Sequence, residues 1–257
     1  MKTLCAMLLV PACLLAFCAR PTGAQAPAGG VLDSGRFVVF SRGEPVATED
    51  FEYERRNDTL FVTSRTDRRA RADDGSIKPY MKSMELIAHA DDWAMLTYLS
   101  TEKFDGHKIN RLVALTDTTI TVAIQKDDFG AADALERLPG RMYVMDAGMF
   151  TLFDVIARSL HGRIFGARPV ALVALADHNA SLYATATPAG RDTIRWGSRP
   201  AIADRITLTD STSTFTMYVS SAGNLLRLEN KVADVVVMRE PPALPPATRR
   251  RRPAPPR

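Results

Sequence analysis

The fold class is decided by one stretch of the chain, INRLVALTDTTITVAIQ at residues 109–125. Two runs rich in apolar and β-branched residues flank an Asp-Thr pair, which is typical of a hairpin turn. In the second run, Ile120, Val122 and Ile124 alternate with threonine, alanine and glutamine. A period of two places the apolar side chains on one face of a strand. The stretch therefore predicts an antiparallel sheet with one apolar face and one face in contact with water.

The sequence on both sides of this hairpin repeats the same pattern, with Gly, Asn-Asp and Ser-Thr turns between short apolar runs. We expect strands at residues 36–41, 45–56, 59–66, 78–89, 93–101, 109–116, 119–125, 202–209, 213–220 and 225–238. Strands do not alternate regularly with helices, so a parallel sheet is not expected.

One segment breaks the two-residue period. Its apolar residues recur at helical spacing, at Met149, Leu152, Phe153, Ile156 and Leu160. Asp146 stands just ahead as a candidate cap, and Gly162 is placed to end the helix. Further apolar residues widen the stripe, which predicts one largely buried helix around residues 148–161. A shorter helical turn is expected at residues 131–138.

The N-terminus has the pattern of a secretion signal. Lys2 precedes an apolar stretch, and small residues accepted by a signal peptidase end at Ala26, with Ala28 as a second candidate cleavage position. All three cysteines fall inside this signal, so the mature chain has no disulfide framework and must rely on a packed core. We expect an exported protein that is periplasmic, associated with the outer envelope, or secreted. The expected divisions are a secretion signal at 1–26, a linker at 27–34, a single β-rich domain at 35–240 and a disordered Pro/Arg tail at 241–257.

The formal net charge of +4 is a property of the two ends of the chain. Two basic residues belong to the signal and five to the tail, which leaves 26 basic and 29 acidic residues in residues 27–240. A mildly acidic domain lacks the basic face that nucleic-acid binding requires, so no nucleic-acid partner is expected. The tail is either a solvated end or a contact to an anionic envelope surface. Its clustered arginines are Arg249, Arg250, Arg251 and Arg252.

Three stretches carry a resemblance to a known family. They are FVVF at 37–40 with GEPVA at 43–47 and Glu49; DAGMF at 146–150 with Leu152, Ile156, Ala157 and Arg158; and YVS at 218–220 with GNLLRLE at 223–229. With these motifs, the chain resembles an uncharacterised family of exported bacterial β-rich proteins known as a domain of unknown function. In shape that family is similar to the half-barrels of lipoprotein-localisation carriers. The resemblance implies a curved antiparallel sheet, a half-barrel-like meander, wrapped about one buried helix and an apolar cavity.

The favoured function is non-catalytic binding of an apolar or lipid-like ligand, or of a protein partner, in the concavity of the sheet. The helix is apolar on more than one side, and the strands have one apolar face. The expected ligand-binding residues are Phe150, Phe153, Ile156, Trp93 and Phe215. No catalytic residue, metal or cofactor is expected, because the sequence has no nucleophile elbow, zinc helix, calcium loop or phosphate-binding glycine loop.

Two other functions stay open. A hydrolase could assemble its site from distant polar residues, and Asp177-His178-Asn179 is the best acid–base candidate because a carboxylate can hold the tautomer of a neighbouring imidazole. However, adjacent residues on a strand point to opposite faces, and a polar trio between apolar runs is typical of a loop. The other function is that of a structural accessory protein that assembles through its sheet edge or tail.

Overall fold

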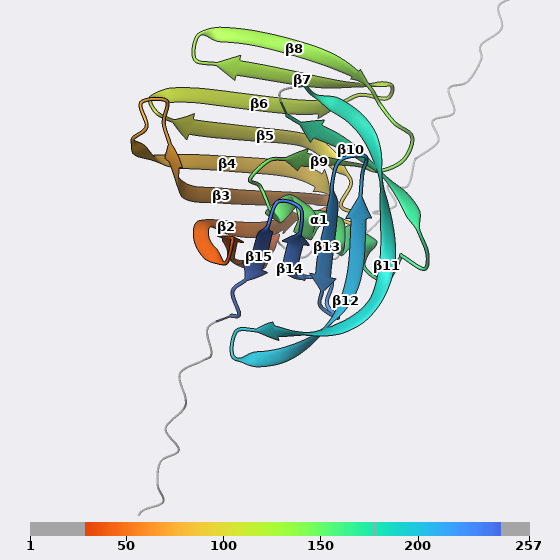
Figure 1. Ribbon diagram of the computed structural model, residues 1–257. Coiled ribbons are helices and arrows are strands. Elements are labelled where there is room, and N and C mark those ends of the chain that lie inside the picture. Colours follow the sequence, from red (N-terminus) through yellow and green to blue (C-terminus); the bar gives the residue numbers. More distant parts are fainter. Residues whose placement is uncertain (1–28, 177, 243–257) are drawn as a thin grey trace, which may run out of the picture.

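A computed structural model describes residues 29–176 and 178–242. In these residues, fifteen strands form one strongly curved sheet around a single helix, α1 (Figure 1). The mainly-β fold class, with a curved sheet and one buried helix, is therefore confirmed. The segment predicted to be a secretion signal, with its cysteines, the arginines of the tail and Asp177 lie outside the described residues.

The bounds of the elements are β1 Gly30–Ser41, β2 Glu44–Arg56, β3 Thr59–Arg71, β4 Ile77–His89, β5 Met95–Phe104, β6 His107–Leu115, β7 Thr119–Lys126, β8 Phe129–Glu136, β9 Met142–Asp146, α1 Thr151–Leu160, β10 Arg168–Leu175, β11 Ala180–Trp196, β12 Arg199–Thr209, β13 Thr214–Val219, β14 Leu225–Asn230 and β15 Val235–Arg239. β1 thus begins inside the segment 27–34 that was expected to be a linker.

The sheet consists of two meanders that meet where the first strand pairs with the last. Its order is β8-β7-β6-β5-β4-β3-β2-β1-β15-β14-β13-β12-β11-β10-β9. Neighbouring strands are antiparallel except β9 and β10, which pair in parallel with α1 between them in the chain. The expectation of no parallel pairing was therefore wrong at this one place. A helical connection is what a parallel pair requires, because the chain must return to the same end of the sheet.

Two further sequence predictions were wrong. Residues 131–138 were expected to form a helical turn, but most of them belong to β8, which pairs with β7 along its whole length. Pairing with a neighbouring strand overrides the helix propensity of alanine. The single strand expected at 225–238 is divided into β14 and β15 by a turn. There the Asn230 side chain accepts hydrogen bonds from the backbone N–H groups of Val232 and Ala233, a local bond that competes with strand geometry.

The helix fills the hollow of the curved sheet, and Figure 1 shows it behind β13 and β14 and beside β9. Nine of its ten residues are buried. The period-two pattern correctly identified the inner face of the sheet, since Ile120 and Val122 are fully buried in the core. A helix that is buried on all sides must find partners for its own polar side chains, because an unpaired buried polar group is costly.

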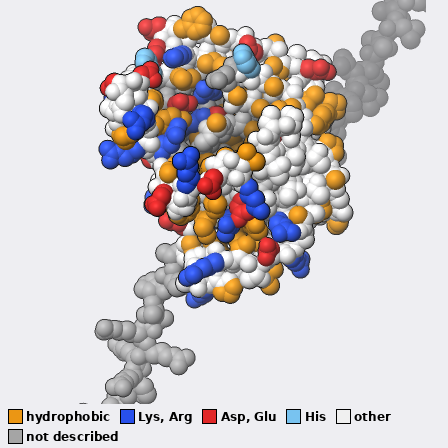
Figure 2. Space-filling model, viewed as in Figure 1, with side chains coloured by type: hydrophobic (Ala, Val, Ile, Leu, Met, Phe, Trp, Pro, Cys, Tyr) orange, Lys and Arg blue, Asp and Glu red, His pale blue; other side chains and the backbone are white. Residues whose placement is uncertain are grey.

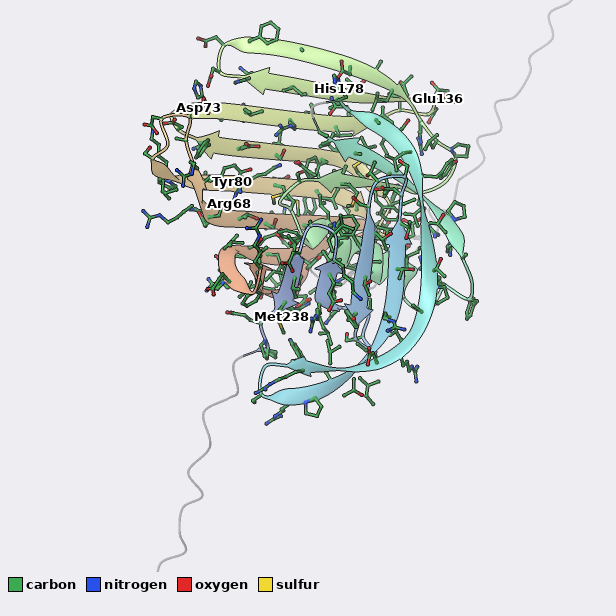
Figure 3. The ribbon with its side chains drawn as sticks, viewed as in Figure 1. Arg68, Asp73, Tyr80, Glu136, His178 and Met238 are labelled. Carbon is green, nitrogen blue, oxygen red and sulfur yellow. The ribbon has the colours of Figure 1, made fainter. Side chains whose placement is uncertain are left out.

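The outer surface is charged most visibly at one end. Figure 2 shows Lys and Arg side chains gathered over the end of the molecule where β3 and β4 join. Arg68 stacks on the ring of Tyr80 there, 4.0 Å from its centroid, as Figure 3 also shows. Burial raises the pKa of Tyr80 to about 12. The hairpin between β3 and β4 therefore lies at the surface, and the guanidinium of Arg68 covers the ring of Tyr80 there.

Candidate functional site

The N-terminal end of α1 is held by an acidic residue from a distant strand. Glu49 of β2 is fully buried and accepts hydrogen bonds from the backbone N–H groups of Phe150 (2.6 Å) and Thr151 (3.1 Å). The Ser64 hydroxyl donates to the same carboxyl at 2.7 Å. The first N–H groups of a helix have no partner inside it, and an acidic side chain there also suits the helix dipole. Glu49 therefore serves as the cap of the helix.

Asp146, expected as that cap, has another role. It ends β9 and is buried beside Lys82 of β4, whose ammonium nitrogen lies 2.5 Å from one carboxylate oxygen. The Tyr98 hydroxyl (2.6 Å) and the Ser100 hydroxyl (3.2 Å) donate to the other oxygen. Lys82 also donates to the carbonyl of Ala147 at 3.0 Å. The prediction for Asp146 was wrong because its partners lie on strands that local sequence does not bring near it.

A third polar cluster lies along the middle of α1. Asp154, fully buried, accepts hydrogen bonds from the Tyr53 hydroxyl (2.7 Å), Arg158 Nε (2.9 Å) and the backbone N–H of Leu225 (2.6 Å). Arg158 also bonds Asp33, which in turn accepts from Arg239 at 2.6 Å. The cluster thus connects the helix to both meanders.

The pKa values of Tyr53 and Asp33 in this cluster are shifted by burial and by their charged neighbours. Burial and the Asp154 carboxylate raise the pKa of Tyr53 well above its usual value, so the phenol stays protonated. Burial alone would raise the pKa of Asp33, but the hydrogen bonds and charges of Arg239 and Arg158 lower it. Paired and hydrogen-bonded charges of this kind lock elements together. Together with the bonds that Glu49 accepts from Phe150 and Thr151, they connect the helix to strands of both meanders.

Of the five expected ligand-binding residues, two belong to α1, Phe150 directly precedes it, and Trp93 and Phe215 come from other parts of the chain. Phe153 and Ile156 are buried in the core, and Phe153 packs on Phe215 of β13 with ring centroids 4.7 Å apart. Phe150 and Trp93 are partly buried at the edge of the same core, where Trp93 meets the ring of Tyr53 edge-on at 5.6 Å. None of the five lines the pocket described next.

The acid–base candidate does not form a visible constellation in the described residues. His178 is exposed, and Figure 3 shows it near the start of β11. The Asn179 side chain donates to Asp133 of β8 at 2.8 Å. In the part of the chain that the structure describes, no group of three or more His, Cys, Asp or Glu side chains is arranged to hold a metal ion.

A pocket of about 590 Å³ opens at the C-terminal end of α1. We call it the helix-end pocket. It is lined by residues 139–141, Tyr143 of β9, Ser159 and Leu160 of α1, residues 168–171 of β10 and Tyr183 of β11. Because its walls come from a loop, a helix and three strands, it is concave rather than a groove along one sheet face. Its volume lies within the range of roughly 300–1,000 Å³ usual for small-molecule sites.

The lining of the helix-end pocket combines apolar walls with a few convergent polar groups. Leu160 and Val170 are buried at its walls. The Tyr143 hydroxyl bonds the Ser159 hydroxyl, which in turn donates to the carbonyl of Asp92 at 2.9 Å. Burial raises the pKa of Tyr143, so its phenol is neutral. This combination is typical of pockets that orient a small, mostly apolar molecule.

A second hollow, of about 890 Å³, lies along β5 to β8. Its centre is the row Leu99, Leu112, Ala123 and Ala132, which strand pairing places side by side. These side chains belong to one sheet face, opposite to the face that packs on α1, so the hollow is an open groove. The helix-end pocket is the better candidate for a binding site, because a loop, a helix and three strands surround it, whereas the second hollow lies on one sheet face.

Sequence reasoning did not identify Arg141, Tyr143 and Arg168, the polar residues of this pocket. They come together only because β9 and β10 pair in parallel, an arrangement that the sequence pattern did not predict. One signal was available for the helix itself: Asp154 and Arg158 interrupt a segment that is otherwise apolar. Four residues apart, they lie on the same side of a helix and can pair.

Comparisons with known proteins found similarities to solved structures. No protein-family model and no curated protein matches the sequence. Among solved structures, a β-barrel-like protein of the domain of unknown function DUF1849 from Brucella abortus is 8% identical, with a TM-score of 0.49, over 82% of this chain and 97% of that one. A DUF1089 family protein from Pseudomonas aeruginosa is 13% identical, with a TM-score of 0.43, over 69% of this chain and 87% of that one.

A search of the described residues for a helix both long and apolar enough to cross a bilayer returned none.

Proposed function

We propose that this chain is a non-catalytic, exported envelope protein that binds an apolar or lipid-like molecule in the helix-end pocket. The observation that carries the proposal is a concave site of about 590 Å³ that has buried apolar walls at Leu160 and Val170 and polar groups from a loop, α1, β9 and β10. A small apolar ligand is favoured by removal of its surface from water, while a few polar groups set its orientation. The expectation of export rests on the N-terminal signal pattern.

The form of the concavity supports a site at this place. The helix occupies the middle of the hollow, where the expected residues Phe153 and Ile156 pack on the sheet. The helix-end pocket lies at the end of the helix and is open to a ligand. The proposed ligand site therefore lies at the margin of the concavity, whereas the sequence predicted it at the centre. The proposed ligand is of the same chemical class in both cases.

The direct test is mass spectrometry of molecules extracted from natively purified protein. We expect a stoichiometric apolar molecule from the unmodified chain and from Phe129→Ser, which changes an exposed aromatic residue on the outer strand β8. Tyr183→Ser removes a partly exposed aromatic wall of the pocket and should lower the ligand content at least about fivefold. A folded protein that is empty, or equal ligand content in both variants, would contradict the proposal.

The tail carries a separate part of the proposed function, contact with an anionic envelope surface through Arg249, Arg250, Arg251 and Arg252. Each basic residue near an anionic bilayer contributes on the order of 1 kcal/mol, and salt screens this attraction. Deleting residues 243–257 should reduce binding to vesicles that contain phosphatidylglycerol and leave binding to phosphatidylcholine vesicles unchanged. Unchanged binding to the anionic vesicles would end this part of the proposal.

A further inference from the structure

The charged side chains that line the helix-end pocket are all positive. Two arginines, Arg141 and Arg168, lie in its lining, and the lining contains no Asp or Glu. The charge of Arg141 is partly met from outside the lining, because its Nε donates to Asp92 at 2.7 Å. Within the part of the chain that the structure describes, Arg168 has no carboxylate within the 4.0 Å of an ion pair. The pocket therefore holds an excess of positive charge.

The arginines keep donors for a bound molecule. A guanidinium carries five N–H donors. Arg168 Nη1 donates to the carbonyl of Arg163 at 3.0 Å, which fixes the side chain and leaves its other donors unassigned. Arg163 lies beyond the end of α1 at Leu160, so this bond does not cap the helix. A held guanidinium with spare donors is suited to an anion, because charge-assisted bonds are about twice as strong as neutral ones.

The hydroxyl groups in the pocket cannot replace the arginines as donors. Ser159 uses its single hydrogen in the bond to the Asp92 carbonyl, so Tyr143 is the donor in the bond between the two hydroxyls. Both hydrogens are thus engaged within the protein. Recognition of an acidic group in this pocket rests on Arg168, with Arg141 beside it.

We propose that the molecule bound in the helix-end pocket is amphipathic and carries an anionic head group, a carboxylate or a phosphate, held by Arg168 and Arg141. This inference rests on the proposed function and specifies its ligand class. The apolar body lies against Leu160 and Val170, and the head group is the counter-charge that the lining lacks. A neutral apolar molecule would leave Arg168 without a counter-charge.

The test compares probes that share one chain and differ in the head group. Binding of dodecanoate, dodecyl phosphate, dodecan-1-ol and inorganic phosphate is measured by isothermal titration below the critical micelle concentrations. We expect the two acidic chains to bind about tenfold more tightly than the alcohol. Inorganic phosphate should bind at least about tenfold more weakly than dodecyl phosphate, since it has no apolar body.

The matched variants are Arg168→Gln in the pocket and Arg199→Gln at an exposed position at the start of β12. Arg168→Gln should weaken both acidic chains about tenfold and leave dodecan-1-ol unchanged, while Arg199→Gln changes nothing. Equal binding of dodecanoate and dodecan-1-ol, or equal behaviour of the two variants, overturns the head-group assignment and leaves the proposed function standing. Inorganic phosphate binding as tightly as dodecyl phosphate overturns the amphipathic ligand. Failure of every chain-bearing probe contradicts the proposed function itself.

Discussion

The two ends of α1 both have charged side chains nearby, but these are paired at one end and partly unpaired at the other. At the N-terminal end, Glu49 and the Lys82–Asp146 pair are buried, and each charge meets partners from other strands. At the C-terminal end, Arg141 and Arg168 line an open pocket whose lining contains no carboxylate. At the N-terminal end, the charged groups are paired within the protein. At the C-terminal end, the pocket lining keeps an excess of positive charge. The comparison teaches that charged side chains stabilise the fold where they are paired and keep hydrogen-bonding capacity where they are not.

The contrast also explains why a buried helix can carry a site at one end only. Tight fixation of the first turn by Glu49 allows the last turn to form one wall of a pocket without loosening the helix. A site supported by rigid elements holds its geometry more accurately than a site on loops. The predictions below test the two ends separately, from the largest expected effect to the smallest.

The substitution Lys82→Met should have the largest effect, because it leaves Asp146 as a buried charge without its counter-charge. We expect a loss of about 3–5 kcal/mol in the free energy of unfolding, measured by urea denaturation. Lys78→Met is the matched control, since Lys78 pairs with acidic residues at a partly exposed position. Its loss should be much smaller, because exposed ion pairs contribute little to stability. Similar losses in the two variants would show that the N-terminal end does not depend on the buried pair.

The substitution Glu49→Ala removes the cap of α1. It leaves the N–H groups of Phe150 and Thr151 and the Ser64 hydroxyl without their acceptor, so the free energy of unfolding should fall by about 1–3 kcal/mol. Glu52→Ala, at an exposed position on the same strand, should lie within about 0.5 kcal/mol of the unmodified protein. A cap role would be disproved by equal stability of the two variants.

The free energy of unfolding should depend on pH through the protonation of the Glu49 carboxyl. Burial raises the pKa of Glu49, although bonds from Thr151, Ser64 and Phe150 oppose the shift. The folded state therefore keeps this proton to a higher pH than the unfolded chain does, and the contribution of Glu49 is lost as pH rises above about 4.5. Glu49→Gln should remove this loss, at most about 1.4 kcal/mol per pH unit. Parallel stability–pH curves for the two proteins from pH 4.5 to 7.5 would contradict the direction of the shift.

The substitution Arg168→Gln should have the smallest effect on stability, within about 0.5 kcal/mol, because no ion pair of the described residues depends on it. Thermal unfolding of the ligand-free protein measures this change. A loss comparable to that of Lys82→Met would mean that the C-terminal end is structural. The comparison between the ends would then fail.

Much of the sheet could be predicted because its signal is local. The alternation of Ile120, Val122 and Ile124 with polar residues reflects the strand itself, and turn residues mark the hairpins. The prediction was wrong where the structure depends on distant partners. Residues 131–138 become β8 through pairing with β7, and the parallel contact of β9 with β10 depends on the position of α1.

The candidate site was hidden for the same reason. Arg141 lies just before β9 and Arg168 begins β10; these two strands meet only in the folded sheet, and no spacing rule relates the two arginines. Glu49 lies about 100 positions before the residues whose backbone N–H groups donate hydrogen bonds to it. The sequence patterns that predict a helix cap relate only neighbouring residues. The apolar residues Phe153 and Ile156 were correctly placed in the helix, but hydrophobicity alone does not distinguish a core from a ligand wall.

The pairing of β1 with β15 has a consequence for how the chain folds. The two strands lie side by side in the middle of the sheet although their paired residues, such as Phe37 and Arg239, are about 200 residues apart. The sheet cannot be completed until the last strand is available. Until then, β1 presents an open edge that another strand can occupy. Slow release of the C-terminal residues during synthesis therefore prolongs the interval in which the protein is exposed to aggregation.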